Sequence, residues 1–290
     1  MFKAFVTLIV GSLFLTCLLT PVVCELIIHF TGQLNWPFSR VFDRVAMVGV
    51  VIMLLVTRKA FSLHAVKEFL QRGSKAEKQR QLFFGLSLSL LSSLVIYVYL
   101  LQTDVLSIQL RETWYYIRKI PVVILAAFLI SLIEEGFFRV ICLQTAKEKL
   151  GFLVAAILIS LLYASVHFIA PLKSFHYLQG EYAAGFVYLS AVFGSVLRAE
   201  LLPAFAGLWI VGMVLSLAIE RAKSLYLCLG LHTGWIIALK LVTFTSSVNL
   251  NFESALARRY VLVAFPVTWL ALLAVVAFLM VRFGNSSRVE

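Results

Sequence analysis

The stretch 121-PVVILAAFLISLIEEGFFRVICL-143 decides the fold of this chain, because it places three charges inside an otherwise apolar run. The apolar residues 122–133 alone are too few to cross a bilayer, which takes about 20 residues of helix. The expected helix therefore continues to residue 143 and carries Glu134, Glu135 and Arg139 to membrane depth. A charge there costs at least about 2.5–3.5 kcal/mol on insertion scales, so such residues usually have partners and a function.

Two of these charges have a spacing that predicts an ion pair. Glu135 and Arg139 are four residues apart, which places both side chains on one helix face, where they can neutralise each other. Glu134 lies about 100° round the same helix and has no such local partner. A chemical role is therefore expected first of Glu134.

The composition indicates a polytopic membrane protein. Of the 290 residues, 62% are hydrophobic and only 13% are charged, about half the charged fraction of a soluble domain. The net charge of +11 fits basic loops that fix topology and contact anionic headgroups, so we infer no nucleic-acid partner. Four cysteines lie in apolar spans without paired spacing, which predicts small buried hydrophobes: Cys17, Cys24, Cys142 and Cys228.

The predicted fold class is all-α, a transmembrane helical bundle of about eight spans with its active site within the membrane. The count becomes nine if the apolar piece 183–197 crosses. The distribution of Lys and Arg favours eight spans, with the N-terminus in the cytoplasm. The N-terminal run 4–28 is interpreted as the first span because it is longer than the apolar region of a signal peptide.

Three segments are expected along the chain. Residues 1–101 hold N-terminal helices and a basic cytoplasmic loop at 58–81, whose amphipathic start could lie on the membrane surface. Residues 102–246 form the core that carries the charged motif, and residues 247–290 add a last helix.

Two histidines, His167 and His232, also lie in predicted spans. A hairpin turning near 147–151 brings Glu134 and His167 to similar depth, because both are roughly 18–22 Å from the turn. In the eight-span arrangement His232 starts from the same side, at about 12 Å. A carboxylate and two imidazoles in a cavity of low dielectric constant can activate water and stabilise an oxyanion.

Other roles for these residues stay open. The set Glu134, His167 and His232 matches a His₂Glu catalytic zinc arrangement, so a divalent metal such as zinc is an alternative. Histidines also form hydrogen bonds between membrane helices, and intramembrane Glu and His serve as proton relays in transporters.

The spacing of three motifs resembles the CPBP family of intramembrane proteases, which includes the type II CAAX prenyl endopeptidases. The motifs are Glu134-Glu135-x-x-x-Arg139, Tyr163-x-x-x-His167, and Arg221-x-x-Ser224-Leu225 continuing to His232. The match covers about residues 120–240.

The resemblance implies a glutamate-dependent endopeptidase of a bacterial inner membrane that cuts membrane-anchored or lipidated protein precursors. Glu134 would activate water with His167, Glu135 and Arg139 would shape the site, and His232 would help to stabilise the oxyanion. The oligomeric state is left open.

The sequence departs from the family pattern at two positions. Tyr163 replaces the usual Phe, and Ile236 replaces the Asn usually found four residues after the third-motif histidine. A missing amide donor could cost about 2.7–4 kcal/mol of oxyanion stabilisation. Thr233 or the indole N–H of Trp235 is the hypothesised replacement. The alternatives are an inactive member that acts as a binding or immunity scaffold, and a proton-coupled transporter.

Overall fold

The computed structural model describes residues 2–60, 68–69, 71–168, 175–196, 199–249 and 260–283. The chain forms two compact units, each discontinuous in sequence: Met1–Ser62 with His167–Ala199, and Leu63–Val166 with Glu200–Glu290. The three sequence segments expected above remain a prediction, and most of the amphipathic start of the basic loop lies outside the described residues. The predicted all-α fold class is confirmed, and the described chain is a bundle of apolar helices.

The described residues of the first unit form three main helices and one short turn of helix. These elements are α1 (Phe2–Thr31), α2 (Phe38–Thr57), the 3₁₀ turn η1 (Arg58–Ala60) and α7 (Ala184–Val196). Helix α1 packs against α2 and α7. Its buried hydroxyl groups donate to backbone carbonyl oxygens four residues earlier, which satisfies them without a partner helix: Ser12, Thr16 and Thr20.

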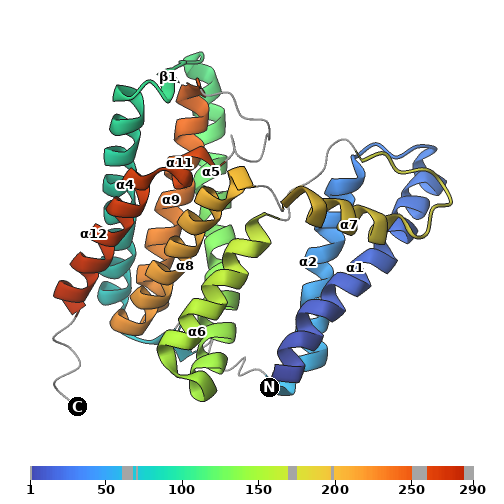
Figure 1. Ribbon diagram of the computed structural model, residues 1–290, viewed down its shortest axis with the longest axis horizontal. Helices are drawn as coiled ribbons and strands as arrows, with labels where there is room; N and C mark the ends of the chain where they lie inside the picture. The colour runs from blue at the N-terminus through green and yellow to red at the C-terminus, as the bar shows by residue number, and fades with distance from the viewer. Residues whose placement is uncertain are drawn as a thin grey trace. The chain divides into compact units, whose positions relative to one another are not determined.

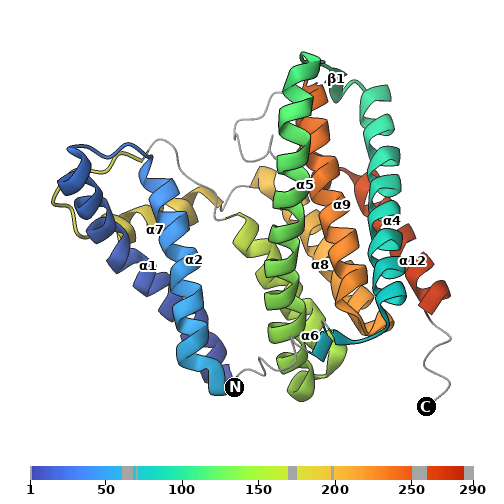
Figure 2. The ribbon, with the colours of Figure 1, turned by 180° about the vertical axis from the view of Figure 1, so that it is seen from behind.

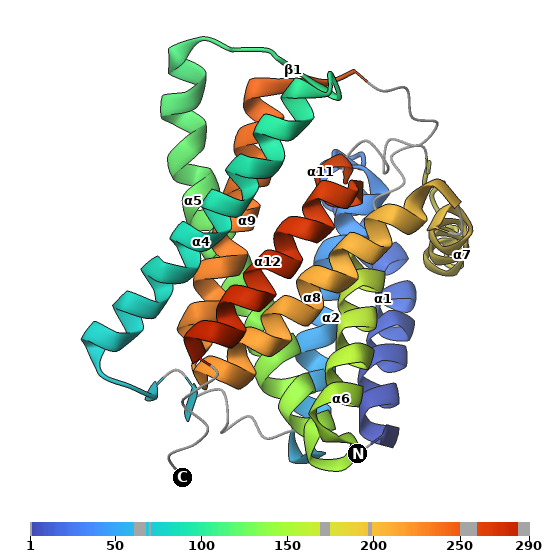
Figure 3. The ribbon, with the colours of Figure 1, turned by 60° about the vertical axis from the view of Figure 1, so that its left-hand side comes forward.

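The second unit holds the remaining helices and one pair of short strands (Figures 1 and 2). Its elements in chain order are α4 (Lys75–Gln102), β1 (Leu106–Ile108), α5 (Thr113–Glu135), η2 (Gly136–Leu143), α6 (Gln144–His167), η3 (Ala199–Leu201), α8 (Leu202–Ala222), α9 (Leu225–Thr245), β2 (Ser246–Val248), α11 (Val261–Ala264) and α12 (Pro266–Phe283). Its outer helices α8 and α12 lie against each other (Figure 3).

Helix α4 begins with a capping motif that the sequence contains. The Ser74 hydroxyl accepts a hydrogen bond from the Glu77 backbone N–H at 3.2 Å, the first half of a capping box. The helix therefore starts at Lys75, seven residues before the apolar run at 82–101 that predicted it. Its first two turns are polar, as expected of a helix that extends beyond the hydrocarbon region.

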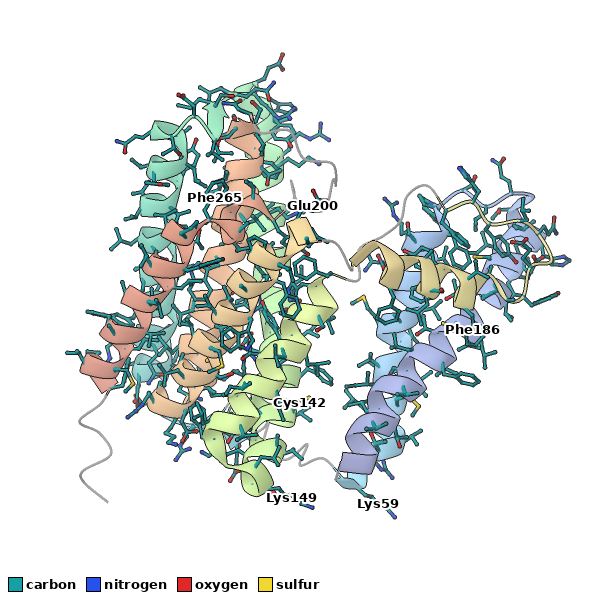
Figure 4. All side chains as sticks on the ribbon, in the orientation of Figure 1. Lys59, Cys142, Lys149, Phe186, Glu200 and Phe265 are labelled. Atoms are coloured by element: carbon teal, nitrogen blue, oxygen red, sulfur yellow. The ribbon has the colours of Figure 1, made fainter. Side chains whose placement is uncertain are left out.

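The charged motif lies on one leg of a helical hairpin, as the sequence predicts. The helical path breaks at Gly151, where φ is 73° and ψ is 164°, and the chain then returns. Because Tyr163 packs edge-to-face on Phe138 with ring centroids 5.4 Å apart, the second leg runs back along the first. Figure 4 labels Lys149 at the tip of this hairpin, where its side chain points away from the helices.

Glycines allow α4 and α9 to approach each other closely. A Cβ atom at Gly230 would lie 2.1 Å from the Leu82 carbonyl oxygen, and one at Gly85 would lie 2.5 Å from the Leu227 carbonyl oxygen. Small residues at this spacing let membrane helices pack backbone against backbone. Figure 2 shows α4, α9 and α5 side by side. This contact fixes the position of α9, the helix that carries His232.

Two short strands, which the sequence analysis did not predict, join α4 and α9 at one end. Strands β1 and β2 pair antiparallel, with Leu106 opposite Val248 and Ile108 opposite Ser246. Strand β1 follows α4 in the chain, and β2 follows α9, so the paired strands bring the C-terminal ends of both helices together. Near the N-terminal ends of the two helices, Gly230 of α9 lies against Leu82 of α4. Helices α4 and α9 therefore run parallel. Three-residue strands without strong alternation leave little signal in a sequence.

The directions of the helices bear on the number of spans. Helix α5 runs antiparallel to α9, α6 returns along α5, and α8 is joined to α9 by a tight turn at Lys223 and Ser224. The chain therefore leaves α6 and enters α8 at the same end of the second unit. At 13 residues α7 is about 20 Å long, shorter than the roughly 30 Å hydrocarbon core.

By length and composition, six helices among the described residues could each cross a membrane. The predicted count of about eight differs for two reasons. Residues 113–167 are one continuous helical stretch although they contain both legs of the hairpin. Helix α2 carries three charges near its start, namely Arg40, Asp43 and Arg44. The span count therefore stays a prediction, whereas an integral membrane protein is established.

The close contact between α4 and α9 predicts the effect of adding one methyl group. Gly230→Ala should lower the free energy of unfolding by about 1–3 kcal/mol, because the new Cβ meets backbone atoms that cannot rotate away. Gly194→Ala is the matched control, since its Cβ would have no atom within 4 Å. The melting temperature of each variant is measured by thermal unfolding in detergent. Equal melting temperatures would contradict the close packing.

Candidate active site

The two glutamates lie where an α-helix changes into a π-helix. Helix α5 ends at Glu135, and the next eight residues, Gly136–Leu143, form the π-helix η2. Such segments are rare and frequently occur at functional sites. No feature of the sequence distinguished this segment from an α-helix. The wider turn ends at Gln144, where the α-helical pattern resumes.

The predicted pair of Glu135 and Arg139 is confirmed. Arg139 Nε lies 3.2 Å from Glu135 Oε2, and both side chains are fully buried. A buried charge without its partner would be strongly destabilising, so each of these groups requires the other. The pair also fixes η2 relative to the last turn of α5.

His232 joins this pair from helix α9. Its Nδ1 atom lies 2.9 Å from Glu135 Oε1, so the carboxylate holds the imidazole on one side and the guanidinium on the other. A carboxylate accepts hydrogen bonds, so this contact assigns the proton of a neutral imidazole to Nδ1. The Nε2 atom is then the unprotonated nitrogen that faces the rest of the site.

Glu134 and Tyr163 lie on the Nε2 side of His232. Glu134 Oε2 is 3.8 Å from Nε2, and the Tyr163 hydroxyl oxygen is 3.4 Å from it. The Glu134 side chain is 27% exposed, whereas that of Glu135 is 0% exposed. Of the two adjacent acids, only Glu134 is therefore partly exposed.

Tyr163 is held by aromatic and cationic contacts. The guanidinium carbon of Arg139 lies 4.9 Å from the centre of the Tyr163 ring, within the range of a cation–π interaction. The Phe138 ring meets Tyr163 edge-on at an interplanar angle of 88°. Residues of η2 thus fix the phenol from two sides.

The other predicted site residues have more varied positions. His167 is the last residue of α6 and is half-buried, and its position relative to Glu134 stays a prediction. Trp235 donates its indole N–H to Ser92 Oγ of α4 at 3.2 Å. Thr233 is buried, and its hydroxyl has no hydrogen-bond partner among the residues that the structure covers. Ile236 lies one turn beyond His232 on α9.

The arrangement does not fit a metal ion within the described part of the chain. No three His, Cys, Asp or Glu side chains there are placed to hold one. Glu135 contacts Nδ1 of His232 with one oxygen and Arg139 with the other, so these atoms already have partners. The His232 Nε2 atom and the Glu134 carboxylate are the remaining possible metal ligands of this cluster.

Comparison with known protein families matches residues 116–238 to the type II CAAX prenyl endopeptidase Rce1-like family. The chain carries an Rce1-like domain. The resemblance found in the sequence motifs is thereby confirmed, since the matched segment contains the double-Glu motif and both histidines. Comparisons with curated proteins and with solved structures found no match.

Within the Rce1-like domain, the geometry separates two kinds of acid. Glu135 is a buried ligand of Arg139 and His232, whereas Glu134 is a partly exposed carboxylate beside a basic imidazole nitrogen. A carboxylate in that position can remove a proton from water. Sequence spacing had indicated the pairing of Glu135 with Arg139, but not the hydrogen bond between Glu135 and His232, which is 97 residues distant in sequence.

The buried cluster predicts that Glu135→Gln destabilises the protein. Loss of the carboxylate charge leaves Arg139 uncompensated, which costs on the order of 3–5 kcal/mol in a buried pair. Glu220→Gln is the matched control, because Glu220 pairs with Lys147 and Lys223 at a partly exposed position and should lose about 1 kcal/mol or less. The melting temperatures of Glu135→Gln and Glu220→Gln are compared by thermal unfolding in detergent. A Glu135→Gln variant as stable as Glu220→Gln would contradict the pairing.

Proposed function

We propose that this protein is an intramembrane endopeptidase in which Glu134 activates the attacking water. One observation carries the proposal. His232 is fixed through Nδ1 by the buried Glu135, and its Nε2 atom lies beside the more exposed Glu134. Membership of the Rce1-like family, a protease family that acts on membrane-associated proteins, supports hydrolysis of a peptide bond.

In the proposed reaction, the Glu134 carboxylate removes a proton from water, and the water oxygen attacks the carbonyl carbon of the scissile bond. The π-electron pair of the carbonyl moves to its oxygen, which becomes the oxyanion of a tetrahedral intermediate. When the C–N bond breaks, Glu134 returns the proton to the leaving amine nitrogen. His232 is oriented by Glu135 and assists Glu134 at the water, because its unprotonated Nε2 atom can accept a hydrogen bond.

His167 is proposed to hold the water together with Glu134. Helix periodicity supports this role, because His167 follows Tyr163 by four residues in α6 and so shares its helix face. Tyr163 is in turn within 3.4 Å of His232 Nε2. A neutral imidazole can accept a hydrogen bond from water and relay its proton.

The proposed substrates are membrane-anchored or lipidated protein precursors. Glu134 lies in a helical stretch apolar enough to cross the bilayer, so a substrate must reach it within or beside the membrane. We further propose a bacterial inner membrane, with the N-terminus in the cytoplasm, because the basic residues of 58–81 follow the positive-inside rule.

The second candidate is an inactive member that binds partners without cutting them. Ile236 favours it, because this side chain has no hydrogen-bond donor at a position where the family usually has an amide. The intact set of Glu134, Glu135, Arg139 and His232 favours hydrolysis. The two candidates differ in whether proteins in the membrane acquire new termini.

Replacement of the proposed base tests this function. Glu134→Gln should abolish cleavage without lowering the yield in the membrane, because the amide keeps the shape of the side chain but cannot accept the proton from water. His167→Ala should slow cleavage by about 10²-fold or more, within the range for acid–base residues. Terminal proteomics of native membranes, comparing wild type with each variant, measures the accumulation of uncleaved precursors.

Glu112→Gln is the control for this experiment. Glu112 is exposed at the start of α5, and its side chain makes no capping hydrogen bond, so the same chemical change there should leave every precursor processed. If wild type and Glu134→Gln give identical protein termini while both are folded, the endopeptidase proposal fails and the binding scaffold takes its place.

A further inference from the structure

The hydroxyl group of Tyr163 lies next to the Nε2 atom of His232. The Tyr163 oxygen is 3.4 Å from Nε2, on the same side as Glu134 Oε2 at 3.8 Å. Since Nδ1 carries the proton that Glu135 accepts, the Nε2 atom accepts and the phenol donates. An O–H donor therefore lies on the same side of His232 as the Glu134 carboxylate.

Neighbouring donors have other partners, are absent, or, like the buried Thr233 hydroxyl, form no hydrogen bond with His232 Nε2 among the described residues. The indole N–H of Trp235 is directed to Ser92 Oγ of α4. The guanidinium of Arg139 pairs through Nε with Glu135 and lies over the face of the Tyr163 ring. Ile236, one turn beyond His232, has an alkyl side chain without a donor. By contrast, the Tyr163 hydroxyl lies within hydrogen-bond distance of His232 Nε2.

We propose that the Tyr163 hydroxyl is a catalytic group that donates a hydrogen bond to the oxyanion of the tetrahedral intermediate. This inference rests on the proposed endopeptidase function and adds to it the identity of the donor. The hydroxyl turns from Nε2 to the oxygen that gains the carbonyl electron pair. Tyr163 keeps its proton throughout, so the proton transfers between water, Glu134 and the leaving amine are unchanged.

The surroundings of Tyr163 suit this role, because a donor stabilises a transition state best when it is already in place. The side chain is almost fully buried, and its ring is fixed by Arg139 on one face and by Phe138 at the edge. The positive charge over the ring favours donation by the hydroxyl. A hydrogen bond from a buried hydroxyl is also stronger than one in water, because solvent does not screen it.

The test removes one oxygen atom. Tyr163→Phe should slow precursor processing by about 10²–10³-fold, the range for loss of one oxyanion donor. The rate is measured by pulse-chase labelling followed by terminal proteomics of native membranes. Tyr97→Phe is the matched control, because its hydroxyl contacts Ser246 at the end of α9, away from the site, and its loss should leave the rate unchanged.

Rescue separates a chemical role from a packing role. Adding Ile236→Asn to Tyr163→Phe supplies an amide donor one helical turn from His232. The double variant should process precursors at least ten times faster than Tyr163→Phe alone. The melting temperature of Tyr163→Phe in detergent should equal that of Tyr97→Phe. A slowed variant that is not rescued, or that melts well below Tyr97→Phe, would assign Tyr163 to packing and overturn the proposal.

Failure of this inference is distinct from failure of the proposed function. If Tyr163→Phe processes precursors at the wild-type rate while Glu134→Gln blocks processing, Tyr163 is not the donor and the endopeptidase stands. If Glu134→Gln also processes at the wild-type rate, the proposed function is overturned, and the role of Tyr163 with it.

Discussion

The rest of the site depends on the buried carboxylate of Glu135. One of its oxygens pairs with Arg139 of the π-helix, and the other holds Nδ1 of His232 on α9. Three elements are therefore joined by one fully buried charge. Burying ions is costly unless their contacts are complete, so this arrangement strongly disfavours alternatives in which α9 shifts or rotates relative to α5. The orientation of the imidazole follows from it.

The helix packing places this carboxylate within reach of its histidine. Gly85 and Gly230 bring the backbones of α4 and α9 together, and Trp235 adds a hydrogen bond to Ser92 on α4. In a bilayer, where lipid is as apolar as a leucine side chain, close packing and such hydrogen bonds are what associates helices. The paired strands at the end of α4 and α9 fix the same register through backbone hydrogen bonds.

The adjacent glutamates lie in different environments, on which their different proposed roles depend. Glu135 has no exposure and two charged or polar partners, whereas Glu134 is about one quarter exposed and lies on the Nε2 side of His232. A structural acid must be shielded and paired, and a general base must be reached by water. The match of residues 116–238 to the Rce1-like family agrees with the proposed division, in which Glu135 maintains the site and Glu134 acts as the base.

The sequence by itself determined the class of protein and much of the charged motif. Apolar runs long enough to span a bilayer can hardly adopt any fold other than helices, since backbone groups must be satisfied within each segment. The four-residue spacing predicted the Glu135–Arg139 pair, and Gly151 ends the predicted turn of the hairpin. These features are local, so sequence periodicity is sufficient to reveal them.

Only the tertiary structure decided which groups meet His232. Its contact with Glu135 spans 97 residues, and that with Tyr163 spans 69; over such separations, spacing indicates a similar depth in the membrane but not which side chains meet. The sequence suggested Thr233 or Trp235 as a replacement donor, whereas helix packing directs the Trp235 N–H to Ser92 and brings the Tyr163 hydroxyl to His232 Nε2. The π-helix was also hidden, because the same residues fit an α-helix until their packing is known.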